Sequence, residues 1–112
     1  MKEFDRFFKN LPGIKSRAMF GGHGLYKQGV IFGIIAQGSI YFKVDATNMK
    51  EYEAAKSEPF TYIGASGKPV SMSYWKVPDS ILKNKEALSE WIEKSLMINL
   101  KKSTKRLSRA KS

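Results

Sequence analysis

The stretch that decides the fold of this chain is residues 17–45, RAMFGGHGLYKQGVIFGIIAQGSIYFKVD. It holds six of the chain's nine glycines, interleaved with β-branched and aromatic residues. Runs of strand-forming residues between glycine-containing turns are typical of consecutive antiparallel strands. Turns are predicted at Gln28-Gly29 and Gln37-Gly38, where glycine accepts the positive φ of a tight turn. The stretch therefore predicts a three-stranded meander.

Each strand of the meander has its own sequence pattern. Residues 18–27 are predicted as a single strand that Gly21-Gly22 interrupts with a bulge or a bend. Residues 30–36 are apolar on both faces, so this strand is expected to be central and buried. Along residues 40–45 apolar and polar residues alternate, which predicts one buried face and one wetter face.

Helices and a second hairpin are predicted around the meander. Near the N-terminus four apolar residues share one helical face, namely Phe4, Phe7, Phe8 and Leu11. Asp45 is a predicted N-cap for a helix that runs to residue 56. Residues 60–63 and 69–76 are predicted as a hairpin. Asn84 is a predicted N-cap for a final helix, which ends near residue 100 and packs Trp91 against the sheet.

The order α-β-β-β-α-β-β-α predicts an α+β fold of two layers, in which helices pack on an antiparallel sheet of about five strands. A chain of 112 residues is long enough for one core. We assign residues 1–100 to this domain and residues 101–112 to a basic C-terminal tail. Because the tail has few apolar residues, it is expected to be frayed or disordered.

Composition excludes several kinds of site. The chain has no cysteine, which excludes disulfides, thiolate nucleophiles and the usual zinc sites. Its first residues lack the apolar core of a signal peptide, and its longest apolar run is only strand-sized. We therefore expect a cytoplasmic protein that does not associate with a membrane.

The positive charge is unevenly distributed. The formal net charge is +10, and the last twelve residues hold six of the twenty basic residues and no acid. Such a surplus predicts an anionic partner. The candidate contacts to nucleic acid or to a partner are Arg17, Lys27 and Lys43 on the strands, and Lys101, Lys102, Lys105, Arg106 and Arg109 in the tail. A helical tail would present the last four as one basic stripe; the alternative is a disordered segment that only increases solubility.

The GGHG run around His23, the only histidine, is the motif most suggestive of an active site. It lacks the lysine of a P-loop and the third glycine of a dinucleotide fingerprint, and the chain has no G-x-S-x-G elbow. The alternative is that His23 acts as a general base or a metal ligand. We expect the glycines to form a bend, with no catalytic residue, metal or cofactor, and the chain not to be an enzyme.

Aromatic and basic residues are interleaved along the predicted strands. One interpretation is a nucleic-acid platform, in which rings stack on bases and lysines contact phosphates. The other is ordinary packing of the rings on both faces of the strands, with lysines at the edges. The residues concerned are Tyr26, Tyr41, Tyr62, Tyr74 and Trp75, with Lys27, Lys43 and Lys76.

A series of short motifs resembles the N-terminal domain of the TfoX/Sxy family of bacterial competence regulators. The motifs are Arg17-x-Met19-Phe20-Gly21-Gly22-x-Gly24-Leu25-Tyr26, Phe32-Gly33, Tyr41-Phe42-Lys43-x-Asp45, Pro59-Phe60-x-Tyr62, Met72-x-Tyr74, Val77-Pro78 and Leu88-x-x-Trp91. The resemblance covers residues 4–100 and implies the same two-layer α+β fold. It also implies a bacterial, cytoplasmic protein linked to DNA transformation, because family members act with the cyclic-AMP receptor protein as transcriptional coactivators.

The resemblance brings no catalytic residues with it. Its signature residues, expected to be structural, are Met19, Phe20, Gly21, Gly22, Gly24, Tyr26, Phe42, Asp45, Pro59, Phe60, Tyr74, Pro78 and Trp91. Full-length members add a second, helical C-terminal domain, and the sequence here ends at Ser112. The first hypothesis is a non-enzymatic module that binds a protein partner in transcription regulation. The alternatives are a nucleic-acid-binding protein that uses its tail, and an enzyme that uses His23; monomer and homodimer both stay open.

Overall fold

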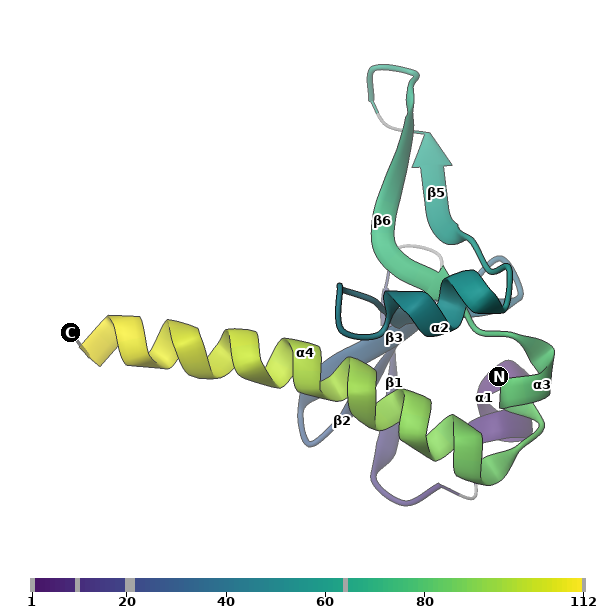
Figure 1. Ribbon diagram of the computed structural model, residues 1–112, viewed down its shortest axis with the longest axis horizontal. Coiled ribbons are helices and arrows are strands. Elements are labelled where there is room, and N and C mark those ends of the chain that lie inside the picture. The colour runs from purple at the N-terminus through teal and green to yellow at the C-terminus, as the bar shows by residue number, and fades with distance from the viewer. Residues whose placement is uncertain (1, 10, 20–21, 64, 112) are drawn as a thin grey trace.

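The computed structural model describes residues 2–9, 11–19, 22–63 and 65–111, without the side chains of residues 2, 3, 19, 62, 63, 69–72 and 101–111. Its elements are shown in Figure 1. In chain order they are α1 (Lys2–Phe8), β1 (Ile14–Met19), β2 (Gly22–Lys27), β3 (Val30–Ala36), β4 (Ser39–Lys43), α2 (Met49–Ala54), β5 (Pro59–Ile63), β6 (Pro69–Lys76), α3 (Asp79–Leu82) and α4 (Lys85–Lys111).

One antiparallel sheet of six strands forms the first layer, in the order β1-β2-β3-β4-β6-β5. The helices form the second layer, and the predicted α+β class is confirmed. Both predicted turns of the meander are also confirmed. Gln28-Gly29 and Gln37-Gly38 each place two consecutive residues at positive φ, as a two-residue hairpin turn requires.

The sheet has one strand more than the sequence predicts, because residues 18–27 are not a single interrupted strand. They belong to the two arms of a hairpin, in which Met19 pairs with Gly22 and Ile14 with Lys27. Residues 20 and 21 connect the arms and lie outside the described residues. A bulge and a tight hairpin both favour glycine, so the glycines alone do not distinguish them. The hairpin satisfies the backbone hydrogen-bonding groups along one side of β2.

The core lies between the sheet and the helices. Phe8 of α1 packs against Phe42, which in turn lies edge-on to Phe32. Trp91 of α4 is buried, as predicted. The buried cluster consists of Phe8, Leu25, Phe32, Ile35, Ile40, Phe42, Val44, Tyr52, Val77, Leu88, Trp91, Ile92 and Leu96. The apolar face predicted for the first helix is confirmed, since Phe4, Phe7 and Leu11 pack against this cluster.

The two predicted N-caps have different outcomes. Asn84 caps α4, because its Oδ1 accepts a hydrogen bond of 3.1 Å from the Ala87 N–H. Asp45 does not cap α2, which begins only at Met49. Its carboxylate instead accepts a hydrogen bond of 2.8 Å from the Thr47 N–H and closes a turn before the helix. The carboxylate of Asp45 is therefore bonded to the Thr47 N–H and is not the cap of α2.

The last helix is longer than predicted. Residues 101–111 are helical and continue α4, although a frayed or disordered tail was expected. Residues 85–112 contain no glycine or proline, so no residue there breaks the helix after Leu100. Lysine and arginine near the C-terminal end also interact favourably with the helix dipole. Figure 1 shows the C-terminal half of α4, in yellow, projecting beyond the sheet.

Candidate functional site: the open face of the sheet

The sheet has two unlike faces. Along β4, buried Ile40 and Phe42 alternate with the half-buried Tyr41 and Lys43. All four helices contribute side chains to the cluster around Ile40 and Phe42. Side chains of the opposite parity, such as Tyr41 and Lys43, therefore point away from the helical layer. We call this side the open face.

A continuous row of paired residues crosses the open face. Arg17 pairs with Gly24, Gly24 with Ile34, Ile34 with Tyr41, and Tyr41 with Lys76. Neighbouring strands lie 4.7–4.9 Å apart, so across these five strands the Cα atoms of Arg17 and Lys76 are about 19 Å from one another. Between them the row carries only a glycine, an aliphatic side chain and a ring. The open face is thus apolar in the middle and positive at both ends of this row.

Two cations of the open face rest on tyrosine rings. The Arg17 guanidinium lies 5.7 Å from the centroid of the Tyr26 ring, and the Lys43 Nζ lies 5.3 Å from that of Tyr74. Such contacts hold a long, flexible side chain in place. Because the rings are covered by cations, they are poorly placed to stack on bases. A pocket of about 310 Å³ lies beside Arg17 and Tyr26 and is also lined by Lys15.

Burial raises the pKa of the Tyr74 hydroxyl, and a hydrogen bond with the Asn99 side chain opposes that shift. Asn99 also donates a hydrogen bond of 2.7 Å from its Nδ2 to the Ile31 carbonyl. These contacts join the Lys43 end of the open face to α4, just before the helix enters its basic C-terminal segment. The two positive regions of the molecule are therefore neighbours.

The charge of the protein is divided between its layers. The six strands contain no Asp or Glu, and all ten acids of the chain lie in helices or loops. The strands hold five basic residues, Lys15, Arg17, Lys27, Lys43 and Lys76. Outside the strands and the last twelve residues, nine basic residues face ten acidic ones. The net charge of +10 is therefore carried by the sheet and by the end of α4.

The structure separates the three candidate contacts that the sequence placed on strands. Arg17 and Lys43 lie on the open face. Lys27 instead forms an ion pair with Glu93 of α4, so it belongs to the helical side. Lys76, which the sequence offered only as one of the lysines interleaved with the strand aromatics, completes the row across the open face. Its pairing with Tyr41 depends on strand order and register, which the sequence does not reveal.

The other candidate contacts belong to the end of α4. Lys101, Lys102, Lys105, Arg106 and Arg109 have a helical backbone, but their side chains lie outside the described residues. Of the aromatic platform considered from the sequence, Tyr26, Tyr41 and Tyr74 share the open face. Trp75 pairs with Phe42 and lies on the core side, 6.4 Å from the Tyr52 ring, and the Tyr62 side chain lies outside the described residues.

The signature residues are distributed over the whole domain. Phe42 and Trp91 are in the core, whereas Tyr26 and Tyr74 are on the open face. The Phe60 ring contacts the Tyr41 ring at 5.0 Å. Gly22 and Gly24 lie in β2, Asp45 precedes α2, Pro59 begins β5 and Pro78 precedes α3. Phe20, Gly21 and the Met19 side chain lie outside the described residues.

His23 is a strand residue rather than part of a loop. It is half-buried in β2, where it pairs with Ala18 on one side and Ile35 on the other. In the described part of the chain, no group of three or more His, Cys, Asp or Glu side chains is arranged to hold a metal ion. The ordered pairing places Gly22, His23 and Gly24 of this run at the beginning of a strand.

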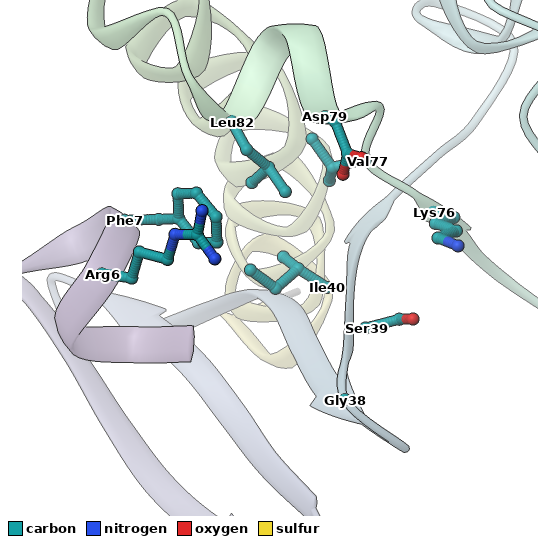
Figure 2. Close-up of a pocket in the computed structure, with 9 residues that line it drawn as sticks. All are labelled: Arg6, Phe7, Gly38, Ser39, Ile40, Lys76, Val77, Asp79 and Leu82. Carbon is teal, nitrogen blue, oxygen red and sulfur yellow. The ribbon is translucent and has the colours of Figure 1, made fainter. Parts of the chain in front are cut away.

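A second pocket lies between α1 and α3, is lined in part by Lys76 at the end of the open-face row, and has a volume of about 430 Å³ (Figure 2). Its lining comes from α1, from the turn between β3 and β4 together with the start of β4, from the end of β6 together with the residue after it, and from α3. The lining residues are Arg6, Phe7, Gly38, Ser39, Ile40, Lys76, Val77, Asp79 and Leu82. We call it the α1–α3 pocket.

These features define a small α+β domain whose open sheet face is free of acidic residues. The family model of the TfoX N-terminal domain matches residues 6–98, and the chain therefore belongs to this family of competence-related regulatory domains. None of the curated proteins compared with the chain matches it. Within the described residues, no helix is both long and apolar enough to cross a membrane.

Proposed function

We propose that the protein is a non-enzymatic regulatory module of the cytoplasm, which acts by binding a protein partner in transcription regulation through its open face. The observation that carries the proposal is the division of charge between the layers. An acid-free, positive face with an apolar middle complements an acidic protein surface and repels a basic one. By family resemblance, the partner is a component of the transcription machinery such as the cyclic-AMP receptor protein.

The open face is partly organised before any partner binds. The rings of Tyr26 and Tyr74 hold Arg17 and Lys43 in place, so ordering these side chains on association costs little additional entropy. Tyrosine and arginine are also enriched in the centres of protein interfaces, where a ring contributes apolar area and a hydroxyl contributes a hydrogen bond.

The titratable groups of the described residues favour a non-catalytic role. The two side chains with a displaced pKa are tyrosines, Tyr52 and Tyr74, and burial raises both values further above neutral pH. A general base works best with a pKa near the working pH, so these shifts move both hydroxyls away from catalysis. They are the expected result of packing a phenol in an apolar environment.

The test is direct binding to purified cyclic-AMP receptor protein, with and without cyclic AMP, measured by biolayer interferometry. Arg17→Glu/Lys43→Glu is expected to weaken binding about tenfold or more, because it reverses two charges of the open face. The matched control, Lys50→Glu/Lys85→Glu, makes the same change in charge at exposed positions of the helical layer and is expected to bind normally. Equal binding by both double variants contradicts the proposal.

A second candidate function is nucleic-acid binding, which the helical continuation of α4 through Lys111 favours. Six basic residues without an acid on one projecting helix would attract phosphates. The test is fluorescence anisotropy with duplex DNA and with RNA between about 50 and 200 mM salt. Replacing Lys101, Lys102, Lys105, Arg106 and Arg109 by Gln is expected to lower affinity and flatten the dependence of log K on log salt. Unchanged binding by this variant, or none by the wild type at low salt, rules out this function.

A further inference from the structure

The α1–α3 pocket has a rigid apolar floor. Ile40 and Val77 form it, and both are core residues with 3% and 1% of their surface exposed. The Val77 N–H donates a hydrogen bond of 2.9 Å to the Ile40 carbonyl, which joins the end of β6 to β4. Phe7 and Leu82 line the pocket from α1 and α3 and pack on the same core. The floor therefore exists without a ligand.

Charged side chains surround the apolar floor of the pocket. Figure 2 shows the Arg6 guanidinium and the Asp79 carboxylate on opposite sides of the space above Ile40, with Leu82 between them. Arg6 is held over the Phe7 ring, 5.2 Å from its centroid. Lys76 and Ser39 lie on the remaining side. Within the described residues, no salt bridge neutralises Arg6, Lys76 or Asp79.

We propose that the α1–α3 pocket binds a small carboxylic acid that carries a hydrogen-bond donor, an amino or hydroxyl group, at the far end of a short apolar body. The carboxylate pairs with the fork of Arg6, and Lys76 adds to the positive potential. The apolar body lies on Ile40 and Val77. The donor group meets the carboxylate of Asp79.

The charge and size of the pocket define this ligand class. Two cations and one acid favour a ligand with a single carboxylate, and Asp79 opposes a second anionic group at the far end. That repulsion also disfavours polyphosphates. The volume of about 430 Å³ lies at the lower end of the range of small-molecule sites. Lys76 belongs both to the row on the open face and to the lining of this pocket. Arg17 and Lys43 are not among the lining residues, so substitutions at these two positions test the partner-binding function separately.

The experiment is NMR titration of the ¹⁵N-labelled full chain with four matched probes: ε-aminocaproate, caproate, adipate and hexylamine. Shifts are expected at the amides of Ile40, Val77 and Asp79, with a Kd on the order of 1 mM for molecules of this size. Affinity is expected to fall from ε-aminocaproate to caproate to adipate, and hexylamine is expected to bind weakly. Absence of shifts at these amides with all four probes, or tightest binding by adipate, overturns the proposal.

Two substitutions test the assigned roles. Arg6→Gln is expected to abolish the difference between ε-aminocaproate and hexylamine, because that difference rests on the carboxylate. Asp79→Asn removes the repulsion of a second carboxylate, so adipate is expected to bind this variant more tightly than it binds the wild type. A variant that failed to fold would not show this gain in affinity. Lys83→Gln, at an exposed residue next to α3, serves as the control and should keep the wild-type order. An unchanged order in both pocket variants would also overturn the proposal.

Discussion

The ring of Tyr52 in α2 packs on the ring of Trp91 in α4, with centroids 4.5 Å apart and planes inclined by 55°. Tyr52 also meets Trp75 of β6, so this one side chain joins two helices to the sheet. The pair connects α2 to the long final helix. Its loss is therefore expected to affect the whole domain.

Trp91→Ala is expected to lower the free energy of unfolding by about 3–5 kcal/mol, because it removes a large buried ring and leaves a cavity. Chemical denaturation followed by circular dichroism measures this loss. Trp91→Phe keeps an aromatic contact to Tyr52 and should lose less than half as much. If the two variants are equally stable, the ring contact is not what holds the helices together.

Tyr52→Phe is expected to change the response to alkaline pH. Burial raises the pKa of Tyr52 in the folded state above the ordinary tyrosine value of 10.0. Above pH 10 the unfolded chain therefore loses a proton that the folded chain retains, so stability falls as pH rises, by up to about 1.4 kcal/mol per pH unit. The variant lacks this titration and should lose less stability between pH 9 and about 11. Identical pH profiles would show that Tyr52 is not a neutral buried phenol.

The same substitution is expected to cost little at neutral pH. The Tyr52 hydroxyl is buried without a hydrogen-bond partner in the described structure, although Ser95 is nearby and donates its own hydroxyl to the Lys43 carbonyl at 2.7 Å. Removing an unpaired buried hydroxyl is neutral or slightly stabilising. A loss above about 1 kcal/mol in urea denaturation at pH 7 would instead reveal a hydrogen bond to Ser95.

Gly33→Ala is expected to destabilise the sheet by about 1–3 kcal/mol, because the new methyl group has no room. A Cβ at this position would lie 2.6 Å from the Tyr41 carbonyl oxygen and 2.7 Å from the Phe42 ring. Gly38→Asn is the control: a Cβ there meets nothing within 4 Å, and Asn tolerates the positive φ. Thermal unfolding should show a lower Tm for Gly33→Ala than for the control, and the reverse order contradicts the packing.

Asn84→Ala is expected to cost about 1 kcal/mol, since it removes the cap that α4 receives at its first turn. Asn84→Asp keeps an oxygen acceptor and should restore most of the stability. Hydrogen exchange measures the local effect at residues 86–88. If the amides of residues 86–88 exchange equally slowly in the wild type, Asn84→Ala and Asn84→Asp, then the packing of Leu88 and Trp91, rather than the cap, determines where the helix begins.

Local patterns predicted most of the elements correctly. Glycine pairs located both turns of the meander, and the spacing of Phe4, Phe7 and Phe8 located the buried face of α1. The alternation in β4 identified which residues are buried. Where one signal fitted two structures, local reasoning failed: the glycines at 21 and 22 suit a bulge as well as a hairpin, and Asp45 suits a turn as well as a helix cap.

The candidate site depended more strongly on tertiary structure. The sequence indicated Arg17 and Lys43 as candidate contacts to a partner. It indicated Lys27 equally, although this side chain forms an ion pair with Glu93 of α4. It did not indicate that Arg6 and Asp79, far apart in the chain, border one pocket, because only the packing of α1 and α3 around the end of the sheet brings them together.

The sequence by itself determined the fold class, the buried residues of the main elements and the amount of positive charge, because these follow from local periodicity and composition. Only the tertiary structure decided where that charge lies. The order β1-β2-β3-β4-β6-β5 and its register align Arg17, Gly24, Ile34, Tyr41 and Lys76 in one row, while the acids remain in the helices and loops. Pairings between distant strands follow from the packing of the whole core, so no local segment of sequence contains them.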